Sequence, residues 1–441
     1  MDRPIAVQER ALTSRLRWRA KTFFSGKRNH VFLIVSTSLL ILNILILGFL
    51  VIVGFRNEDR LEPVRPEGLS APELSRLAAE YVLINENFPD PCFIESDDTF
   101  YAYATRNGST ANIQVATAPT SNISSWTFFP GQDALPDPGP WTAKQLHDIA
   151  VWAPSVVEVS PTSFILYYSA LAASHPRRHC IGAATSTSAL GPYTPLSHPL
   201  VCNFTAGGAI DPQFFHDPLT HKSYLLYKVD GNAVGSGGAC GNSNLPNTPT
   251  PIMAAPLDPN NLTSLLNTSA PFEVVTNQHF DGAYLENPML WYHPFASRHI
   301  DGYEGAYHLI FNAGCFTDAS YRVEHVVCLA DPRYGVEECR WHNIRSGKDR
   351  VRRPYAGTLL RTGDTPAKVV APGGPNVALR GCKGEVNQRW LAFHADVHVE
   401  WFGSGEPMVG ASRRRGFFIA ELEYPDTTEG LELGKLLKPL V

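Results

Sequence analysis

Charge is scarce in this sequence, and neither sign dominates. Only 18 % of the 441 residues are Asp, Glu, Lys or Arg, and the formal net charge is -5. Nucleic-acid-binding proteins carry a clear basic surplus, so the composition predicts no nucleic-acid partner. The hydrophobic content of 44 % allows a large core, and an aromatic content of 11 % favours β structure.

Three motifs are missing as well. The sequence contains no Cys-x-x-Cys pair, which argues against a structural zinc site. It contains no Asp-x-Asp motif and shows no alternation of strands with helices, which argues against a luminal glycosyltransferase. After residue 80 no long helical periodicity is found, and short runs rich in aromatic and β-branched residues prevail.

What is present begins with an apolar segment. Residues 31–55 ("VFLIVSTSLLILNILILGFLVIVGF") carry no formal charge and can cross about 30 Å of hydrocarbon. A buried helix is the alternative, whereas a signal peptide would have a shorter apolar core and a clear cleavage site. Eight Lys or Arg and two acids precede the segment, so the positive-inside rule predicts a cytosolic N-terminus. We therefore expect a type II membrane protein of the secretory pathway or cell surface.

The cysteines and the sequons agree with that topology. All eight cysteines follow the apolar segment, and an even number in an oxidising compartment permits up to four disulfides in any pairing. Five Asn-x-Ser/Thr sequons lie on the same side and are predicted to be glycosylated. They begin at Asn107, Asn122, Asn203, Asn261 and Asn267.

A three-part pattern repeats five times along the rest of the chain. In each unit an element with proline near its start precedes an aromatic run and a partner run, as in "DPCFIE", "TFYAYAT" and "NIQVATA". Such self-similarity indicates a repeat architecture, and three or four strands per unit predict an all-β, five-bladed β-propeller. A β-sandwich with coincidental spacing is the alternative. The five proline-bearing elements begin at Asp90, Ala153, Asp211, Asn287 and Gly374.

These observations divide the chain into five predicted regions. The propeller is preceded by one transmembrane helix and by a charged stalk that contains Pro and has room for one short helix. The regions are a basic cytosolic tail (1–30), a signal-anchor helix (31–55), a stalk (56–83), the propeller (84–425) and a C-terminal tail (426–441).

The repeat gives the proline-preceding positions a shared place. The first strand of every propeller blade lines the central channel, so residues at the same end of those strands approach the axis. Three units place an acid there, namely Asp90, Asp211 and Glu286, and the other two place Trp152–Ala153 and Gly373–Gly374. We therefore expect three carboxylates in one pocket.

Three converging carboxylates favour glycoside hydrolysis. Like charges raise one another's pKa, so one carboxyl can stay protonated and act as an acid while another stays ionised and activates water. The third carboxylate can orient the acid and tune its pKa. A calcium site is the rival interpretation, because Ca²⁺ accepts carboxylate oxygens.

The same residues resemble glycoside hydrolase family 43. The similarity covers nearly all of the chain after the stalk. "FPDPCFIESDDTFYAYAT" is similar to the family's opening Asp-Pro strand, and "SSWTFFPGQDALP" to its Trp-containing segment that ends in Ala-Leu-Pro. "VWAPSV", "AIDPQFF" and "YLENPML" are similar to the start of blades two, three and four, and "RWLAFHAD" to the fifth-blade strand that ends in His.

The resemblance implies a fold, a reaction and a role for each residue. Family members are five-bladed propellers that hydrolyse arabinose- or xylose-containing glycans with inversion. By correspondence Asp90 is the general base, Glu286 the general acid, and Asp211 the residue that tunes and orients the acid. Trp152 forms a sugar-binding wall. His394 matches an axial histidine that contacts substrate or lies near a bound cation. The alternatives for Trp152 and His394 are ordinary core packing.

The sequence also departs from the family pattern. Asn287 follows the fourth-blade Glu where many members have Ala or Gly, the fifth-blade start lacks a His-Asn pair, and the insertion after the third blade is long. These departures affect the sugar and the metal more than the fold. No cofactor is required for the expected chemistry, although a structural calcium or other cation in the channel is an alternative expectation.

Two other functions compete with an arabinofuranosidase, arabinanase or xylosidase. One is a non-catalytic, membrane-tethered propeller that binds glycans. The other is a fructan- or sucrose-cleaving propeller, but the sequence has neither an Asn-Asp-Pro-Asn-Gly opening nor an Arg-Asp-Pro third motif. The expected partners are a carbohydrate and, through residues 31–55, a membrane.

Overall fold

The structure, a computed structural model, describes most of the chain after residue 67. The described residues are 68–106, 111–143, 150–277, 284–295, 303, 305–339, 341, 357–380, 385–399, 414–424 and 431–439. Within them no helix is long and apolar enough to cross a membrane. The predicted tail 1–30 and membrane segment 31–55 lie outside the described residues and stay predictions.

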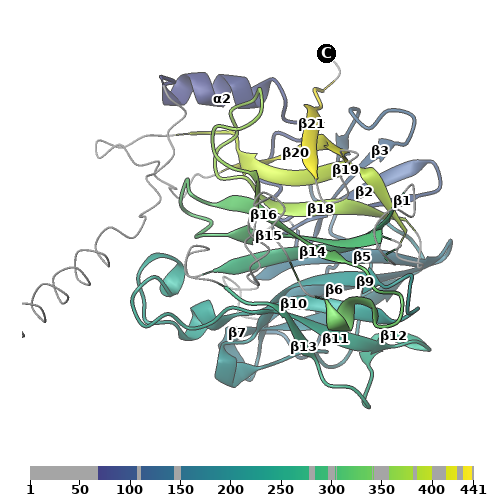
Figure 1. Cartoon of the computed structure of the whole chain (residues 1–441). Helices are drawn as coiled ribbons and strands as arrows, with labels where there is room; N and C mark the ends of the chain where they lie inside the picture. The colour runs from purple at the N-terminus through teal and green to yellow at the C-terminus, as the bar shows by residue number, and fades with distance from the viewer. Residues whose placement is uncertain are drawn as a thin grey trace, which may run out of the picture. The chain divides into compact units, whose positions relative to one another are not determined.

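The described strands form five blades, each from four consecutive strands (Figure 1). Blade one holds β1 (Cys92–Ser96), β2 (Thr99–Ala104), β3 (Gln114–Pro119) and β4 (Thr127–Phe128); blade two holds β5 (Val151–Ser160), β6 (Ser163–Ala172), β7 (His175–Ser186) and β8 (Thr194–Pro195). Blade three holds β9 (Ala209–His216), β10 (Ser223–Val229), β11 (Ile252–Asp258) and β12 (Asn261–Leu265), with β13 (Phe272–Val275) also paired to β11.

The last two blades follow the same plan. Blade four holds β14 (Leu285–Pro294), β15 (Gly305–Ala313), β16 (Arg322–Leu329) and β17 (Gly357–Leu360); blade five holds β18 (Gly373–Arg380), β19 (Glu385–Asp396), β20 (Arg415–Glu423) and β21 (Glu432–Leu436). Among the residues that the structure describes, four short 3-10 turns lie between strands, at Phe204–Ala206, Gly231–Val234, Ala239–Gly241 and Gly335–Glu338. The predicted five-bladed propeller is confirmed.

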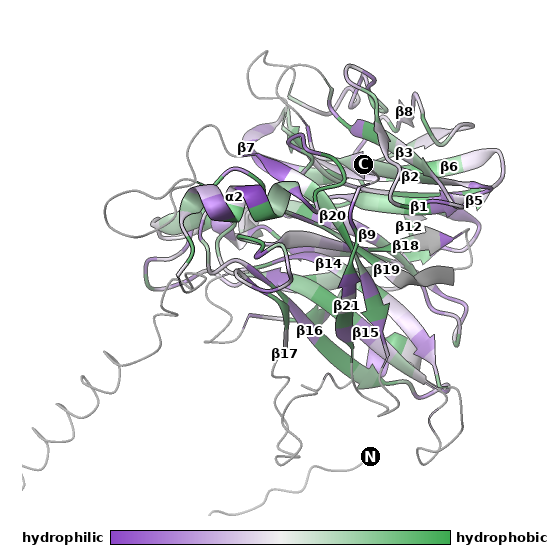
Figure 2. Cartoon of the chain, turned by 90° about the horizontal axis from the view of Figure 1, so that it is seen from above, coloured by the Kyte–Doolittle hydropathy of each residue, from purple (hydrophilic) through white to green (hydrophobic). Residues whose placement is uncertain are grey.

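The first strands of the blades close a ring. β1 contacts β5, β5 contacts β9, β9 contacts β14, β14 contacts β18, and β18 returns to β1. The last contact is a parallel pairing in which Ile94 lies opposite Leu379, and it joins blades one and five into one sheet. Figure 2 shows apolar stretches on inner strands such as β9 and also on outer strands such as β16.

The chain segment before β1 also joins the two ends of the propeller, because it pairs with β20 of blade five. The Leu83 N–H donates to the Phe417 carbonyl at 2.8 Å, the Phe417 N–H donates to Ile84 at 3.0 Å, and the Phe88 N–H donates to Arg415 at 2.8 Å. This segment therefore pairs with the first half of β20, while β21 pairs with its second half. The predicted boundary between the propeller and a C-terminal tail (426–441) is therefore corrected, because β21 lies beyond residue 425 and completes blade five.

The predicted stalk contains the expected short helix, α2 (Ala71–Ala79). It begins with a capping box, in which the Ser70 N–H and hydroxyl both donate to Glu73 at 2.8 and 2.6 Å. Leu74 is fully buried, and Ala78 is 2 % exposed. Because this helix packs into the propeller's core, the end of the predicted stalk belongs to the propeller.

Proline at the start of four inner strands marks a β-bulge. In β9, Ile210 pairs with Lys228 and Gln213 with Leu226, so Asp211 and Pro212 lie together opposite Tyr227. The same two-against-one step occurs in β5, β14 and β18. A bulge leaves a residue out of the ladder, which suits proline because it has no N–H to donate.

Three disulfides are present among the described cysteines, at Cys180–Cys202, Cys240–Cys315 and Cys328–Cys339. Cys92 is a buried free thiol, and burial raises its pKa to about 12. Cys382 lies outside the described residues. The predicted oxidising compartment accords with these bonds.

The longest disulfide loop gives a stability prediction. Cys240 and Cys315 are 75 residues apart, against 11 for Cys328 and Cys339. Because a cross-link restricts the unfolded chain more when its loop is longer, Cys240→Ser with Cys315→Ser should cost about 4 kcal/mol and the shorter pair about 3 kcal/mol. Urea unfolding of both double variants measures the order. A larger loss for the 11-residue loop would contradict it.

Candidate active site

Residues from all five inner strands line one pocket of about 260 Å³. Each strand contributes a proline and the residue before it, and all five of those residues have a positive φ. They are Asp90 (52°), Ala153 (46°), Asp211 (57°), Asn287 (49°) and Gly374 (57°). Positive φ is rare outside glycine, and bulges next to a site re-aim side chains. The shared bend therefore brings these positions together at the axis.

Asp90 lies just before β1 and lines the axial pocket. The Thr105 hydroxyl donates to its Oδ2 at 2.7 Å, and Arg415 Nη1 lies 3.8 Å from its Oδ1. Thr105 Oγ1 in turn accepts the Ala153 N–H at 2.8 Å. The side chain is 15 % exposed. A carboxylate that is held on one oxygen and partly exposed can accept a proton from water.

Asp211 lies at the bulge of β9 and is 7 % exposed. Its Oδ2 accepts the Asn287 N–H at 3.0 Å, and its own N–H donates to Ser169 Oγ at 3.0 Å. Burial raises the pKa of Asp211 to about 8, and the charges of Glu286 and Asp90 add to the rise while Lys228 opposes it. Asp211 therefore holds a proton near neutrality, within electrostatic reach of both other acids.

Glu286 is not the counterpart of Asp90 and Asp211 in the repeat. The bulge of β14 is formed by Asn287 and Pro288, so the predicted equivalence is wrong by one residue. The Glu286 carboxylate still lies within electrostatic reach of Asp211. Lys228 Nζ donates to Glu286 Oε1 at 2.8 Å, and the Tyr321 hydroxyl donates to Oε2 at 3.2 Å.

Four residues that hold two of the acids were not predicted from the sequence. Thr105 and Arg415 contact Asp90, and Lys228 and Tyr321 contact Glu286. A signal for Lys228 is present in "SYLLYKVD", where one cation interrupts an apolar strand. A buried lysine needs an acid partner, so its position pointed to a nearby carboxylate.

Trp152 precedes the bulge of β5 and is 36 % exposed. Its ring stacks on His179 at a centroid distance of 3.8 Å. His179 is buried, and burial lowers its pKa to about 3, so the ring beneath Trp152 is neutral. An exposed indole face beside the pocket can stack on a sugar, and sugar binding by Trp152 stays a prediction.

His394 lies on β19 and is fully buried. Its Nδ1 accepts the Asp90 N–H at 3.0 Å, so it supports the backbone of Asp90. A Cβ on Gly373 would lie 2.2 Å from Tyr321 Cε1, and one on Gly374 would lie 2.8 Å from His394 Nδ1. Only glycine therefore fits where blade five passes these two rings. Direct contact of His394 with substrate or a cation stays a prediction.

Four of the five predicted glycosylation sites are described. Asn203, Asn261 and Asn267 are exposed, Asn122 is partly exposed, and Asn107 lies outside the described residues. Asn203 precedes the Phe204–Ala206 turn and its side chain accepts the Ala206 N–H at 3.2 Å. Exposure leaves room for glycans on these three residues.

A family comparison agrees with this geometry. The sequence model of glycosyl hydrolases family 43 matches residues 80–293, a stretch that runs from the end of α2 into β14 and contains Asp90, Asp211 and Glu286. The chain carries this family's sequence pattern over those residues. It is therefore a glycosidase, and its propeller carries the family's fold.

Solved structures share the fold at low identity. A thermostable family-43 glycoside hydrolase is 20 % identical with a TM-score of 0.53, covering 80 % of this chain and 95 % of that one. An endo-1,4-beta-xylanase from Bacteroides thetaiotaomicron is 20 % identical with a TM-score of 0.52, covering 81 % and 98 %. An alpha-L-arabinofuranosidase from Lactobacillus brevis is 14 % identical with a TM-score of 0.52, covering 82 % and 99 %.

These likenesses show the fold of the family-43 propeller and leave its sugar open. A comparison with curated proteins found no match.

Proposed function

We propose that this family-43 glycosidase hydrolyses arabinose- or xylose-containing glycans with inversion. Asp90 acts as the general base, Glu286 as the general acid, and Asp211 orients the acid and tunes its protonation. The observation that carries the proposal is that Asp90 and Asp211 line one axial pocket, and that Asp211 keeps a proton near neutral pH within electrostatic reach of both Asp90 and Glu286.

The contacts around the acids fit those roles. Asp90 is fixed through one oxygen by Thr105, which leaves the other oxygen near Arg415 to take a proton from the attacking water. Glu286 donates its proton to the leaving oxygen, and the bond from that oxygen to the anomeric carbon breaks as water attacks from the opposite face. The chemistry proposed here uses no cofactor.

The substrate class draws support from the family relatives. Solved members of the same fold are named as an endo-1,4-beta-xylanase and an alpha-L-arabinofuranosidase, whose sugars are pentoses. Trp152, with an exposed ring beside the pocket, is proposed as one wall of the sugar site. A channel cation beside His394 is a separate proposal, and loss of activity in EDTA with recovery in calcium tests it.

A substrate panel tests the function. The purified full chain is assayed with aryl α-L-arabinofuranosides, aryl β-D-xylosides, linear arabinan and xylan. Turnover of at least one pentoside is expected. Binding of these glycans without turnover would favour the non-catalytic propeller, and neither binding nor turnover would overturn the substrate class.

The location is proposed separately from the chemistry. We infer a type II membrane protein with the propeller in the lumen or outside, supported by the uncharged residues 31–55, the three disulfides and the exposed sequons. Protease treatment of sealed microsomes tests it. The propeller is expected to resist the protease and to shift in mass after removal of N-glycans, whereas digestion without detergent would contradict the topology.

A further inference from the structure

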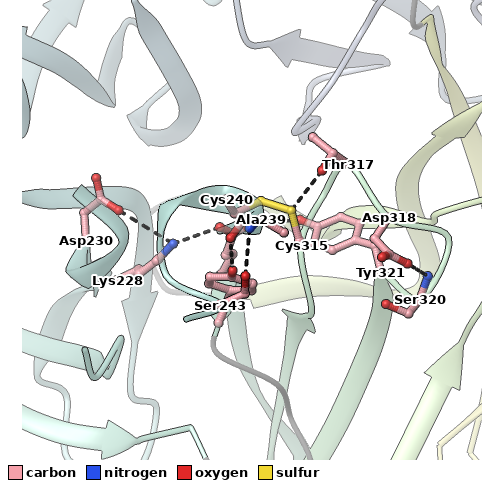
Figure 3. The surroundings of a disulfide bond; sticks show 12 residues. Lys228, Asp230, Ala239, Cys240, Ser243, Cys315, Thr317, Asp318, Ser320 and Tyr321 are labelled. Atoms are coloured by element: carbon pink, nitrogen blue, oxygen red, sulfur yellow. Dashed lines mark hydrogen bonds and ion pairs between the residues drawn. A yellow bond between two sulfur atoms is a disulfide. The ribbon is translucent and has the colours of Figure 1, made fainter. Parts of the chain in front are cut away.

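Lys228 is the least expected group in the site. It lies on β10 with no exposed surface, yet its Nζ donates to Glu286 Oε1 at 2.8 Å and lies 3.8 Å from Asp230 Oδ1. Figure 3 shows Lys228 and Asp230 beside the Cys240–Cys315 disulfide. A buried ammonium is costly unless acids pair with it, so this lysine has its charge only because of the carboxyls around it.

Those carboxyls come from three elements. Asp211 lies on β9, Glu286 on β14, and Asp230 directly after β10. Burial lowers the pKa of Lys228, but the charges of Glu286, Asp230 and Asp211 outweigh burial and raise it. Lys228 is therefore an ammonium, with three donors and no acceptor.

Both carboxylate oxygens of Glu286 accept hydrogen bonds from buried side chains. Lys228 holds Oε1, and the Tyr321 hydroxyl holds Oε2 at 3.2 Å. Tyr321 is 1 % exposed and packs with Leu74 of α2 and Val370. The carboxyl plane is thus fixed from two sides.

The loop after Asp230 is anchored as well. It carries Cys240, which is bonded to Cys315, and the Tyr284 hydroxyl donates to the Ala239 carbonyl in the same loop (Figure 3). Asp230 is 10 % exposed at its side chain. This second acid remains beside Lys228 when Glu286 becomes neutral, so the ammonium keeps a partner in both protonation states of Glu286.

We propose that Lys228 is a positioning residue for Glu286, which it orients so that Oε2 is the oxygen that carries and delivers the proton. This inference rests on the proposed function. Because an ammonium cannot accept a hydrogen bond, Oε1 facing it stays unprotonated. In hydrolysis the Oε2–H bond breaks and its proton moves to the leaving oxygen as the bond from that oxygen to the anomeric carbon breaks. The attacking water forms the new bond to the anomeric carbon and gives a proton to Asp90. Asp90 then releases that proton to solvent, and Glu286 takes one up from solvent, so both acids return to their starting states.

The leaving group distinguishes this role from general packing. A 2,4-dinitrophenolate departs without protonation, whereas an alkoxide needs the acid. Lys228→Met should therefore lower kcat/KM about a hundredfold for an alkyl or sugar leaving group and less than about threefold for the 2,4-dinitrophenyl glycoside. Lys228→Arg, which keeps the charge, should fall between Lys228→Met and the native chain on the alkyl substrate.

Coupling to Glu286 is measured with the double variant of the full chain. If Lys228 acts through Glu286, adding Lys228→Met to Glu286→Gln should produce no further loss on the alkyl glycoside. Lys222→Met is the matched control, because Lys222 directly precedes β10, the strand that holds Lys228, but pairs with Glu337 at the surface, where its side chain is 53 % exposed. Lys222→Met should have the same kcat/KM on the alkyl glycoside as the native chain.

Each outcome decides the inference. Equal losses on both leaving groups in Lys228→Met, or a double variant slower than Glu286→Gln by the full Lys228→Met factor, would overturn the positioning role. If Lys228→Met does not fold by thermal melting, Lys228→Arg is compared on the same two substrates, and an equal loss there would likewise overturn it. A native chain inactive on every substrate would refute the proposed function instead.

Discussion

Replacing Asp90 by Asn is expected to lower kcat/KM by about a thousandfold or more with little change in the melting temperature. An amide oxygen cannot take a proton from the attacking water at neutral pH. The Thr105 hydroxyl can still donate to that oxygen, as it does to Asp90 Oδ2 at 2.7 Å, so the fold of blade one should persist. Initial rates on the preferred aryl pentoside and a thermal melt measure both.

Two comparisons sharpen the result. Asp98→Asn is the control, because Asp98 is an exposed acid in the turn between β1 and β2, and it should retain native activity. Azide needs no general base, so it should restore part of the turnover of Asp90→Asn on a 2,4-dinitrophenyl substrate. Native activity in Asp90→Asn would remove Asp90 from the mechanism.

Replacing Asp211 by Asn is expected to lower activity and to stabilise the fold at neutral pH. Burial and the neighbouring acids raise the Asp211 pKa to about 8, against about 3.9 in an unfolded chain. The native state therefore keeps a proton that the unfolded state loses. Above pH 4 this mismatch progressively destabilises the native state relative to the unfolded state as the pH rises toward 8.

The sign of the effect follows from that window. A raised pKa contributes stability that is present in full below pH 4 and is lost as the pH rises toward 8. Asn does not titrate, so the stability of Asp211→Asn relative to the native chain should increase between pH 5 and pH 8. Urea unfolding at both pH values measures it, with Asp98→Asn as the flat control. A relative stability that falls with pH would show that Asp211 is ionised in the fold.

The regular part of the fold is predictable from the sequence because its signal is local. The repeated triplets correspond to the first three strands of every blade, since each run carries its own aromatic and β-branched residues. The fourth strands were missed. β4 and β8 have two residues each, too few for alternation to be visible, and β21 lies beyond the last triplet.

The site is predictable in part for a similar reason. Asp90 and Asp211 precede proline, and in every unit the residue before that proline has a positive φ. Glu286 was placed one residue out of register, because the residue before Pro288 is Asn287, which takes the positive φ of 49°. Lys228 and Tyr321 contact Glu286 from 58 and 35 residues away, so the local pattern around Lys228 predicts an acid partner but not which acid it is.

The configuration of the first product tests the central claim most directly. The claim is that Asp90 activates water against the anomeric carbon while Glu286 protonates the leaving oxygen, in one displacement. Proton NMR during the first minutes of hydrolysis of the preferred aryl pentoside by the full chain records the anomer before it equilibrates. The account predicts a product of inverted configuration. A product that first appears with the substrate's own configuration would require a covalent glycosyl–enzyme intermediate and would contradict it.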